Sequence, residues 1–396
     1  MIEGKNEIYG SHMLSLLYRM PGLSRSDLAD MLKLDRGTVS RIVQYLISNG
    51  FVFEGSEVQE SSDQAGRKKI PLYLSDTSGC SIGLEVQYEF IKYGALSPLG
   101  SELFSGITYR SSKGNLFKDI LSAVSLAKEQ LQGRPLFGIG IALSGLVDPI
   151  RGTLLFSPFS DARNTSLSLG ADLEKYLGVP IFLDNDAKCC CYDVLSRPYQ
   201  PQTTDLEGPA SRNPDNFIYT FCEFIENGED TGRFDRIGIG TAVVLQEKIF
   251  YGSRFAAGEF RNLYADPAIP GQFGRFSRDY FLTMRSDPER RALFIHDLAG
   301  SMAYIANFMD IQLVYMGGGI ERYAEEMQRA FDQAVETTWL YQKYLPRHIQ
   351  IQFAPSDEKP AVRGAAAMVH RHIFAGPIHA GQQKTGLAYL EGLPKL

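Results

Sequence analysis

The segment IFLDNDAKCCC, residues 181–191, places two acids and an amide directly after an apolar stretch. The acids are Asp184 and Asp186, and Asn185 lies between them. A carboxylate here can accept a proton from a reacting hydroxyl, hydrogen-bond a ligand, or cap the helix that the sequence predicts from about Ala187. For Asp184, capping is a sufficient explanation. For Asp186 the residues leave three further roles open: a catalytic base, a ligand contact, or the remnant of a former active site.

A second set of candidates lies in LSRSDLADMLKLDRGTVSRIVQYLISNGFV, residues 23–52. This segment predicts two short amphipathic helices around a break at Leu34–Asp35, with Ser24 and Asp35 as N-caps and Asn49–Gly50 as the C-terminal stop. The apolar stripe of the second helix leaves polar side chains exposed at its N-terminal end, the end that a helix-turn-helix protein inserts into the major groove. These side chains are Arg36, Thr38, Ser40 and Arg41.

The following residues, 51–75, predict two strands around a long polar turn, which is typical of a wing. The concentrated positive charge of this turn lies at Arg67, Lys68 and Lys69. Residues 1–76 contain nine Lys or Arg and ten Asp or Glu, so binding to double-stranded DNA must depend on the arrangement of a few cations. One such module is too weak to be specific against a genome, so we expect a homodimer or homotetramer that brings two copies to spaced half-sites.

The composition predicts a globular protein in a reduced compartment. The chain has 396 residues, is 44% hydrophobic and 22% charged, and has a formal net charge of -6. Its five cysteines, three of them adjacent at 189–191, lack the spacing of a zinc knuckle and suit small apolar filler. No apolar stretch is long enough for a transmembrane helix, and the N-terminus is acidic and polar where a signal peptide is basic and then apolar. We therefore expect a cytoplasmic protein with no membrane partner.

After Ser78–Gly79 the pattern changes to alternating strand and helix signals. Residues 80–103 predict a pair of hairpin strands, 116–131 a helix, and 136–147 a buried strand. Residues 169–186 predict a helix, a turn and a strand, and 313–335 a strand, a glycine turn and a helix. This alternation predicts an α/β domain with mixed sheets covered by helices and clefts at the carboxyl ends of strands.

Residues 24–52 closely resemble the winged helix-turn-helix of ROK family regulators (repressors, open reading frames and sugar kinases), and GRKK at 66–69 lies where that family has its wing-tip Gly-Arg. Later segments resemble the ROK sugar-kinase domain in the family's order. They are GIGIALSGLVD (138–148), GTLLFSP (152–158), LGVPIFLDNDAKCC (177–190), RFAAGEF (254–260), VYMGGGI (314–320) and RGAAAMV (363–369). The resemblance implies an α/β fold with a winged helix-turn-helix (1–76) followed by a two-lobed actin/hexokinase-like domain (77–396), with an insertion near 197–216.

The same resemblance assigns the candidate site. Asp186 matches the family's catalytic base, and Gly145, Asn185 and Glu259 match its sugar pocket, where carboxylates and an amide suit vicinal hydroxyls. Asn262 stands where the family has a histidine that contacts both sugar and zinc. The family's cysteine-rich zinc motif is absent, so we expect no metal. These five residues are the predicted ligand contacts, and Asp186 is interpreted as a former base.

The phosphate loops depart from the family. GLEVQYEF (83–90) replaces the motif Asp-x-Gly-Gly-Thr, with Glu85 at the acid position and larger side chains in place of the glycines. An acidic Asn-Gly hairpin at 225–236 replaces the second loop, and only the GGG of 317–319 remains on the nucleotide side. Side chains and negative charge would exclude a triphosphate, so we expect no ATP binding, no cofactor and no catalytic residue.

These observations predict a DNA-binding transcriptional repressor whose degenerate sugar-kinase fold senses a sugar or sugar derivative as its small-molecule effector without phosphorylating it. Two alternatives remain open. The first is an active ROK sugar kinase with an appended DNA-binding domain. The second is a regulator whose effector is not a sugar, or which has no effector and uses the domain only for assembly.

Overall fold

The structure is a computed structural model of the chain. It describes residues 5–56, 69–111, 115–157, 166–197, 215–224, 237–269, 271–274, 276, 278–284, 286–354, 358–375 and 390. The chain divides into two compact units. Unit 1 comprises Met1–Asp184, Tyr192–Asp205 and Ala361–Leu396, and unit 2 comprises Asn185–Cys191 and Leu206–Pro360. None of the helices in these described ranges is long and apolar enough to cross a membrane.

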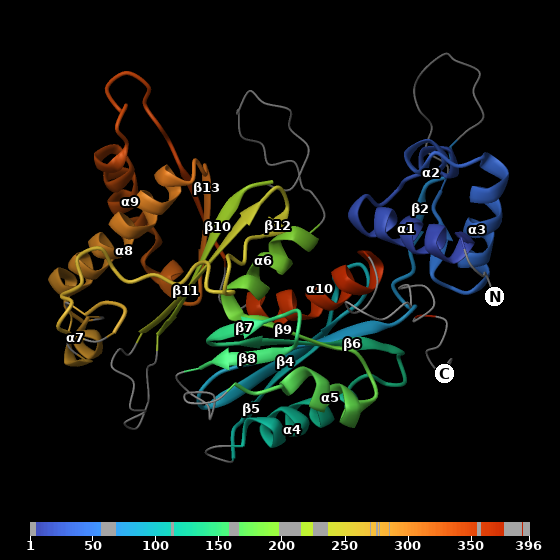
Figure 1. Ribbon diagram of the computed structural model, residues 1–396, viewed down its shortest axis with the longest axis horizontal. Coiled ribbons are helices and arrows are strands. Elements are labelled where there is room, and N and C mark those ends of the chain that lie inside the picture. Colours follow the sequence, from blue (N-terminus) through green and yellow to red (C-terminus); the bar gives the residue numbers. More distant parts are fainter. Residues whose placement is uncertain are drawn as a thin grey trace. The chain divides into compact units, whose positions relative to one another are not determined.

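Unit 1 begins with three helices and two short strands (Figure 1). A first helix, α1 (Lys5–Arg19), precedes the two predicted helices, α2 (Arg25–Leu32) and α3 (Arg36–Ser48), and the two predicted wing strands, β1 (Val52–Glu54) and β2 (Leu72–Leu74). Ser24 caps α2 in a reciprocal capping box with Asp27, and the carboxylate of Asp35 accepts the backbone N–H of Thr38 at the start of α3. Lys33 takes the left-handed conformation at the break between the helices, and Gly50 does so after α3, so both predicted helix boundaries are confirmed within one or two residues.

The rest of unit 1 is a five-stranded mixed sheet with the order β5-β4-β3-β6-β9 (Figure 1). Its strands are β3 (Cys80–Val86), β4 (Phe90–Leu96), β5 (Glu102–Tyr109), β6 (Leu136–Leu143) and β9 (Ile181–Asn185). Helices α4 (Leu116–Glu129) and α5 (Leu169–Leu177) cover one face. A short ribbon of β7 (Leu146–Asp148) and β8 (Thr153–Phe156) follows β6. The predicted hairpin, helix and buried strand are thus all present.

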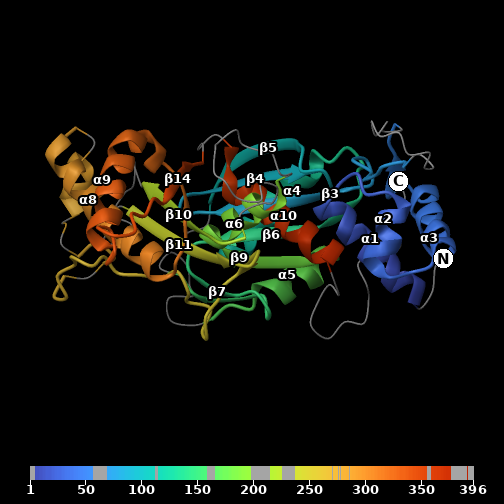
Figure 2. The same cartoon turned by 90° about the horizontal axis from the view of Figure 1, so that it is seen from above.

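The opposite face of this sheet carries α10 (Pro360–Ala375), which crosses the strands in the view from above (Figure 2). The helix lies unusually close to β3 and β6. Because side chains alternate along a strand, the isoleucines and leucines of β3 and β6 face α4 while Gly83 and Gly140 face α10. A Cβ added at Gly83 would lie 2.0 Å from the carbonyl oxygen of Val362, and one at Gly140 would lie 1.8 Å from that of Ala365. Only glycine permits this approach.

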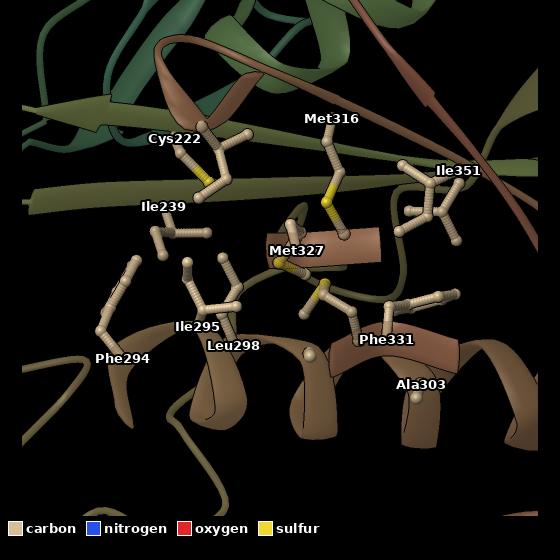
Figure 3. Packing of buried hydrophobic residues seen from close by; sticks show 14 of the residues in the cluster. Cys222, Ile239, Phe294, Ile295, Leu298, Ala303, Met316, Met327, Phe331 and Ile351 are labelled. Atoms are coloured by element: carbon tan, nitrogen blue, oxygen red, sulfur yellow. The ribbon is translucent and has the colours of Figure 1, made fainter. Parts of the chain in front are cut away.

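Unit 2 contains a second five-stranded sheet with the order β12-β11-β10-β13-β14. The strands are β10 (Phe217–Phe224), β11 (Ile237–Leu245), β12 (Lys248–Ile249), β13 (Leu313–Gly317) and β14 (Gln350–Phe353). The helical segments are α7 (Arg278–Thr283), α8 (Pro288–Phe308), η2 (Ile320–Tyr323) and α9 (Ala324–Thr338). Figure 3 shows the core between this sheet and α8 and α9, where Met316 points toward Met327 and Phe331. Burying one side chain of this kind stabilises the folded state by roughly 1.5–3 kcal/mol.

One helix belongs to both units. Helix α6 (Asp186–Ser196) starts in unit 2 and ends in unit 1. In unit 1, the carboxylate of Asp193 accepts hydrogen bonds from Arg363 of α10 at 3.1 Å and from Arg197 at 2.6 Å. The side chain of Ser196 hydrogen-bonds to the hydroxyl of Tyr18, and burial raises the pKa of that hydroxyl. The end of α6 therefore contacts both α10 and the N-terminal helix α1.

All five cysteines lie in the described ranges, are buried and form no disulfide there. Burial raises the pKa of Cys80 to about 12, which makes the reactive thiolate scarce. The three adjacent residues 189–191 lie within α6 and are fully buried. Their environment agrees with the interpretation of these residues as small apolar filler.

We expect stability to fall in acid because of His370 on α10. His370 is 1% exposed among the rings of Tyr18, Phe137 and Phe374, and burial lowers its pKa to about 3. The unfolded chain takes up a proton near pH 6.5 whereas the folded chain does not, so stability is complete above that pH and is lost as pH falls toward 3. This group alone contributes about 1.4 kcal/mol per pH unit in that window.

Urea unfolding at pH 7, 6 and 5 measures this dependence. His370→Phe should flatten it, whereas His348→Gln on the exposed surface should keep the wild-type slope. An unchanged slope in His370→Phe would show that other groups cause the loss in acid.

Candidate functional site

Two of the predicted site residues in unit 2, Asn185 and Asp186, lie at the start of α6. The side-chain oxygen of Asn185 accepts the backbone N–H groups of Ala187 at 3.0 Å and Lys188 at 3.3 Å, and Asp186 Oδ1 accepts that of Ala187 at 2.8 Å. Asn185 and Asp186 thus share the capping, whereas Asp184 lies one residue earlier, fully buried within β9. Capping and ligand contact are compatible for Asp186, because a carboxylate offers two oxygens and about four lone-pair sites.

Strand β11 brings this helix start together with the segment that carries Glu259. A Cβ added at Gly240 would lie 3.2 Å from Asp186 Oδ1 and 3.1 Å from the Cβ of Ala187. One added at Gly258, whose φ is +97°, would lie 1.7 Å from the carbonyl oxygen of the next β11 residue, Thr241. Gly240 of β11 thus lies against Asp186, and the neighbouring Thr241 lies against Gly258, the residue before Glu259, where only glycine fits.

Glu259 keeps solvent contact at this place. Burial by surrounding protein raises the pKa of its carboxyl, and the charge of Lys188 opposes that rise. A solvent-accessible carboxylate with a raised pKa can accept a hydrogen bond from a ligand hydroxyl. Lys188 lies beside the candidate site, and the sequence analysis did not single it out. The available signal in the sequence was that Lys188 is the one cation between the acids Asp184 and Asp186 and the three cysteines at 189–191.

Asn262 differs from the other candidates because its side chain is hydrogen-bonded to residues of α8. It is 4% exposed, and its amide nitrogen donates to Asp297 at 2.9 Å. Its amide oxygen accepts from the hydroxyl of Ser301 and from the backbone N–H of Tyr264, each at 3.2 Å. This geometry suits a residue that anchors the segment after Glu259 to α8. Direct ligand contact by Asn262 stays a prediction.

Gly145 belongs to unit 1, in the turn between β6 and β7. Its φ is +134°, and an added Cβ would lie 2.1 Å from the carbonyl oxygen of Phe156 in β8. This glycine is therefore required by the β7–β8 ribbon itself. Its role as a ligand contact also stays a prediction.

The segment 83–90, which we predicted to stand in place of the first phosphate loop, carries side chains with partners inside the protein. Glu85 is buried at the end of β3 and accepts hydrogen bonds from Gln87 at 3.0 Å and from Lys92 at 3.2 Å. The guanidinium of Arg110 donates to the carbonyl oxygens of Gln87 and Tyr88, each at 3.2 Å. The carboxylate and the turn backbone thus have partners within the protein.

The glycine turn after β13 is occupied as well. The backbone N–H of Gly319 donates to a carboxylate oxygen of Glu321 at 2.7 Å, so an acidic side chain takes the place that an anion would need. A Cβ at Gly319 would lie 2.9 Å from the ring of Phe224. Close packing on β10 therefore explains this glycine. The acidic hairpin that we predicted at 225–236 lies outside the described residues.

The predicted DNA-contacting residues of α3 lie together at its N-terminal end. Arg36, Ser40 and Arg41 are exposed, and Thr38 is half-buried. The guanidinium of Arg41 donates to the Thr38 hydroxyl at 3.3 Å. Lys69 forms an ion pair with Asp27 at 3.0 Å, while Arg67 and Lys68 lie outside the described residues. No group of three His, Cys, Asp or Glu side chains suited to a metal occurs in the described ranges.

Sequence comparison finds two family matches in the chain. Residues 11–68 match the MarR family, and residues 107–195 match the ROK family. The xylose repressor of Bacillus subtilis is 26% identical over 260 residues, which cover 64% of this chain and 59% of the repressor. The chain thus aligns with about three fifths of the length of this relative.

Solved structures share the fold. A ROK family transcriptional regulator, a homologue of the E. coli MLC protein, aligns with a TM-score of 0.69 at 16% identity over 98% of this chain and 99% of that chain. A ROK family glucokinase from Streptomyces griseus, in complex with glucose and AMPPNP, aligns with a TM-score of 0.55 at 19% identity over 73% and 99% of the two chains. These matches confirm the predicted fold class. The chain therefore carries a MarR-type helix-turn-helix followed by a ROK family domain.

Proposed function

We propose that this chain is a DNA-binding transcriptional repressor whose ROK domain senses a sugar or sugar derivative without phosphorylating it. One observation carries the proposal: the exposed Arg36 and Arg41 at the start of α3, and the carboxylates Asp186 and Glu259 on segments that pack against β11, occur on the same polypeptide. The repressor acts in the cytoplasm as a homodimer or homotetramer, because two modules are needed to select an operator.

Sugar binding is supported by the residue types at the start of α6. Asn185, Asp186 and Glu259 combine an amide with two carboxylates, which suit the donor and acceptor pairs of neighbouring hydroxyls. D-xylose is the first sugar to test, because the B. subtilis relative is named a xylose repressor.

The absence of phosphoryl transfer is proposed from the two occupied turns. Phosphoryl transfer needs backbone amides and a metal ion placed around the transferred group. Here Glu85 and Lys92 pair beside the first turn, and Glu321 occupies an amide of the second. Each arrangement would have to open before a triphosphate could bind.

We expect Asp186→Asn to separate DNA binding from sugar response. The substitution keeps the side-chain shape and removes a charged acceptor, so D-xylose binding should weaken roughly 10- to 150-fold, as for loss of a charge-assisted hydrogen bond. Operator affinity without sugar should stay unchanged. The operator is obtained by selecting bound sequences from random DNA, and affinities are measured by fluorescence anisotropy with and without D-xylose.

Asp172→Asn, on the exposed face of α5, is the matched control and should respond like the wild type. A variant Asp186→Asn that responds normally to the sugar would remove Asp186 from the site. Failure of the wild type to select any DNA sequence would refute the repressor, and steady conversion of ATP to ADP with D-xylose would refute the non-enzymatic assignment.

A further inference from the structure

Lys188 is an unusually placed lysine. It is 2% exposed, although lysine is seldom buried without a paired charge. Among the described residues its ammonium makes one hydrogen bond, which it donates to the carbonyl oxygen of Phe255 at 2.8 Å. The same group lies 5.3 Å from the centre of the Tyr251 ring. Removing an ammonium from water is costly, so a buried charge at this place calls for an explanation beyond filling space.

Both contacts fall on the segment Tyr251–Glu259, which ends at the candidate carboxylate. This segment has no helix or strand, and its residues 252–254 are exposed. Phe255 has a φ of +60°, which is unfavourable for a residue with a side chain. Lys188 thus holds the carbonyl of the one non-glycine residue in the segment that is in a left-handed conformation.

A third interaction concerns Glu259 itself. The positive charge of Lys188 lowers the pKa of the Glu259 carboxyl, against the larger effect of burial. Lys188 therefore acts on the first residue, the middle and the last residue of one short segment. The helix that carries Lys188 starts at Asp186, the other candidate carboxylate.

We propose that Lys188 is a positioning residue of the ligand site, whose buried ammonium fixes the Tyr251–Glu259 segment against the start of α6 and so presents the Glu259 carboxylate. The alternative is that Lys188 packs through its methylene chain and its charge is incidental. The proposal rests on the proposed function for the identity of the ligand, whereas the fixing of the segment is a property of the unliganded chain and is tested without sugar.

Hydrogen exchange of the full chain, followed by mass spectrometry, tests the fixing directly. Lys188→Met keeps the length of the side chain and removes its charge and donors. It should speed exchange in peptides covering 250–262 at least tenfold, while β10, β13 and α8 keep their protection. Lys188→Arg, which retains a cation and donors, should stay within about threefold of the wild type. Lys248→Met, at an exposed lysine of β12, should match the wild type.

Wild-type exchange in Lys188→Met, or equal acceleration in Lys248→Met, would overturn the proposal. If Lys188→Met fails to fold, Lys188→Arg decides, because exchange as fast as in an unprotected segment would also overturn it. The double variant Lys188→Met/Glu259→Gln separates the effect of charge from that of packing. We expect Lys188→Met to lower the melting temperature, and removal of the Glu259 charge should restore part of that loss. Additive losses from the two substitutions would contradict an electrostatic role of Lys188. If the wild type does not bind D-xylose but Lys188→Met shows the expected exchange changes, D-xylose is refuted as the ligand and the positioning role of Lys188 remains.

Discussion

Gly140→Ala is expected to destabilise the folded chain by more than about 3 kcal/mol, because a single methyl group would collide with the backbone of α10. The added Cβ would lie 1.8 Å from the carbonyl oxygen of Ala365 and 2.5 Å from its carbonyl carbon. Neither atom belongs to a side chain that could rotate away, so the helix and the central strand β6 would have to separate along their contact. Urea unfolding followed by far-UV circular dichroism measures the loss.

Gly300→Ala on α8 is the matched control. Its added Cβ would lie 3.1 Å from the hydroxyl of Tyr264, whose side chain is 44% exposed and can move. Alanine also favours helix over glycine by about 1 kcal/mol, so this variant should stay within about 1 kcal/mol of the wild type. If Gly140→Ala were as stable as Gly300→Ala, helix α10 would not pack on β6 as closely as described.

The contrast between these glycines shows what the sequence could and could not predict. The alternation of residues 136–147 predicted a buried strand, which β6 confirms. The reason for Gly140 lies in a contact with Ala365, which is more than two hundred residues away along the chain. Periodicity within a window describes one element and its exposed side. It contains no information about which later element will pack against that side.

In the candidate site, too, the sequence did not show which segments pack together. The residue types of Asn185, Asp186 and Glu259 suggested a polar ligand, and the structure places the first two at the start of α6 and brings the Glu259 segment to β11 beside them. The orientation of Asn262 toward α8 was not predictable, because Asp297 became its partner only through folding. Lys188 was missed because a lysine at a helix start is ordinarily a solvated residue. Only the structure shows that it is buried beneath a neighbouring segment.

The double variant Arg36→Ala/Arg41→Ala is expected to weaken operator binding at least 100-fold without affecting the fold. Both guanidinium groups are exposed within the first turns of α3, whose buried stripe of Val39, Ile42 and Val43 fixes the direction in which they project. A single arginine contact to a base edge or phosphate contributes about 1–3 kcal/mol, so two contacts account for this loss. Because the module as a whole is nearly neutral, distant cations provide little compensation.

Arg25→Ala tests whether the loss follows from position or from charge alone. Arg25 lies on α2 and its guanidinium is paired with Glu54 of β1, so it should change operator affinity less than about fivefold. The salt dependence of operator binding then shows whether Arg36 and Arg41 contact phosphates or base edges. Loss of a phosphate contact lowers the magnitude of the slope of log K against log salt by about one, whereas loss of a base contact mainly relaxes the sequence preference. Equal losses for Arg25→Ala and the double variant would mean that the module binds by general charge, and α3 would then not be the reading helix.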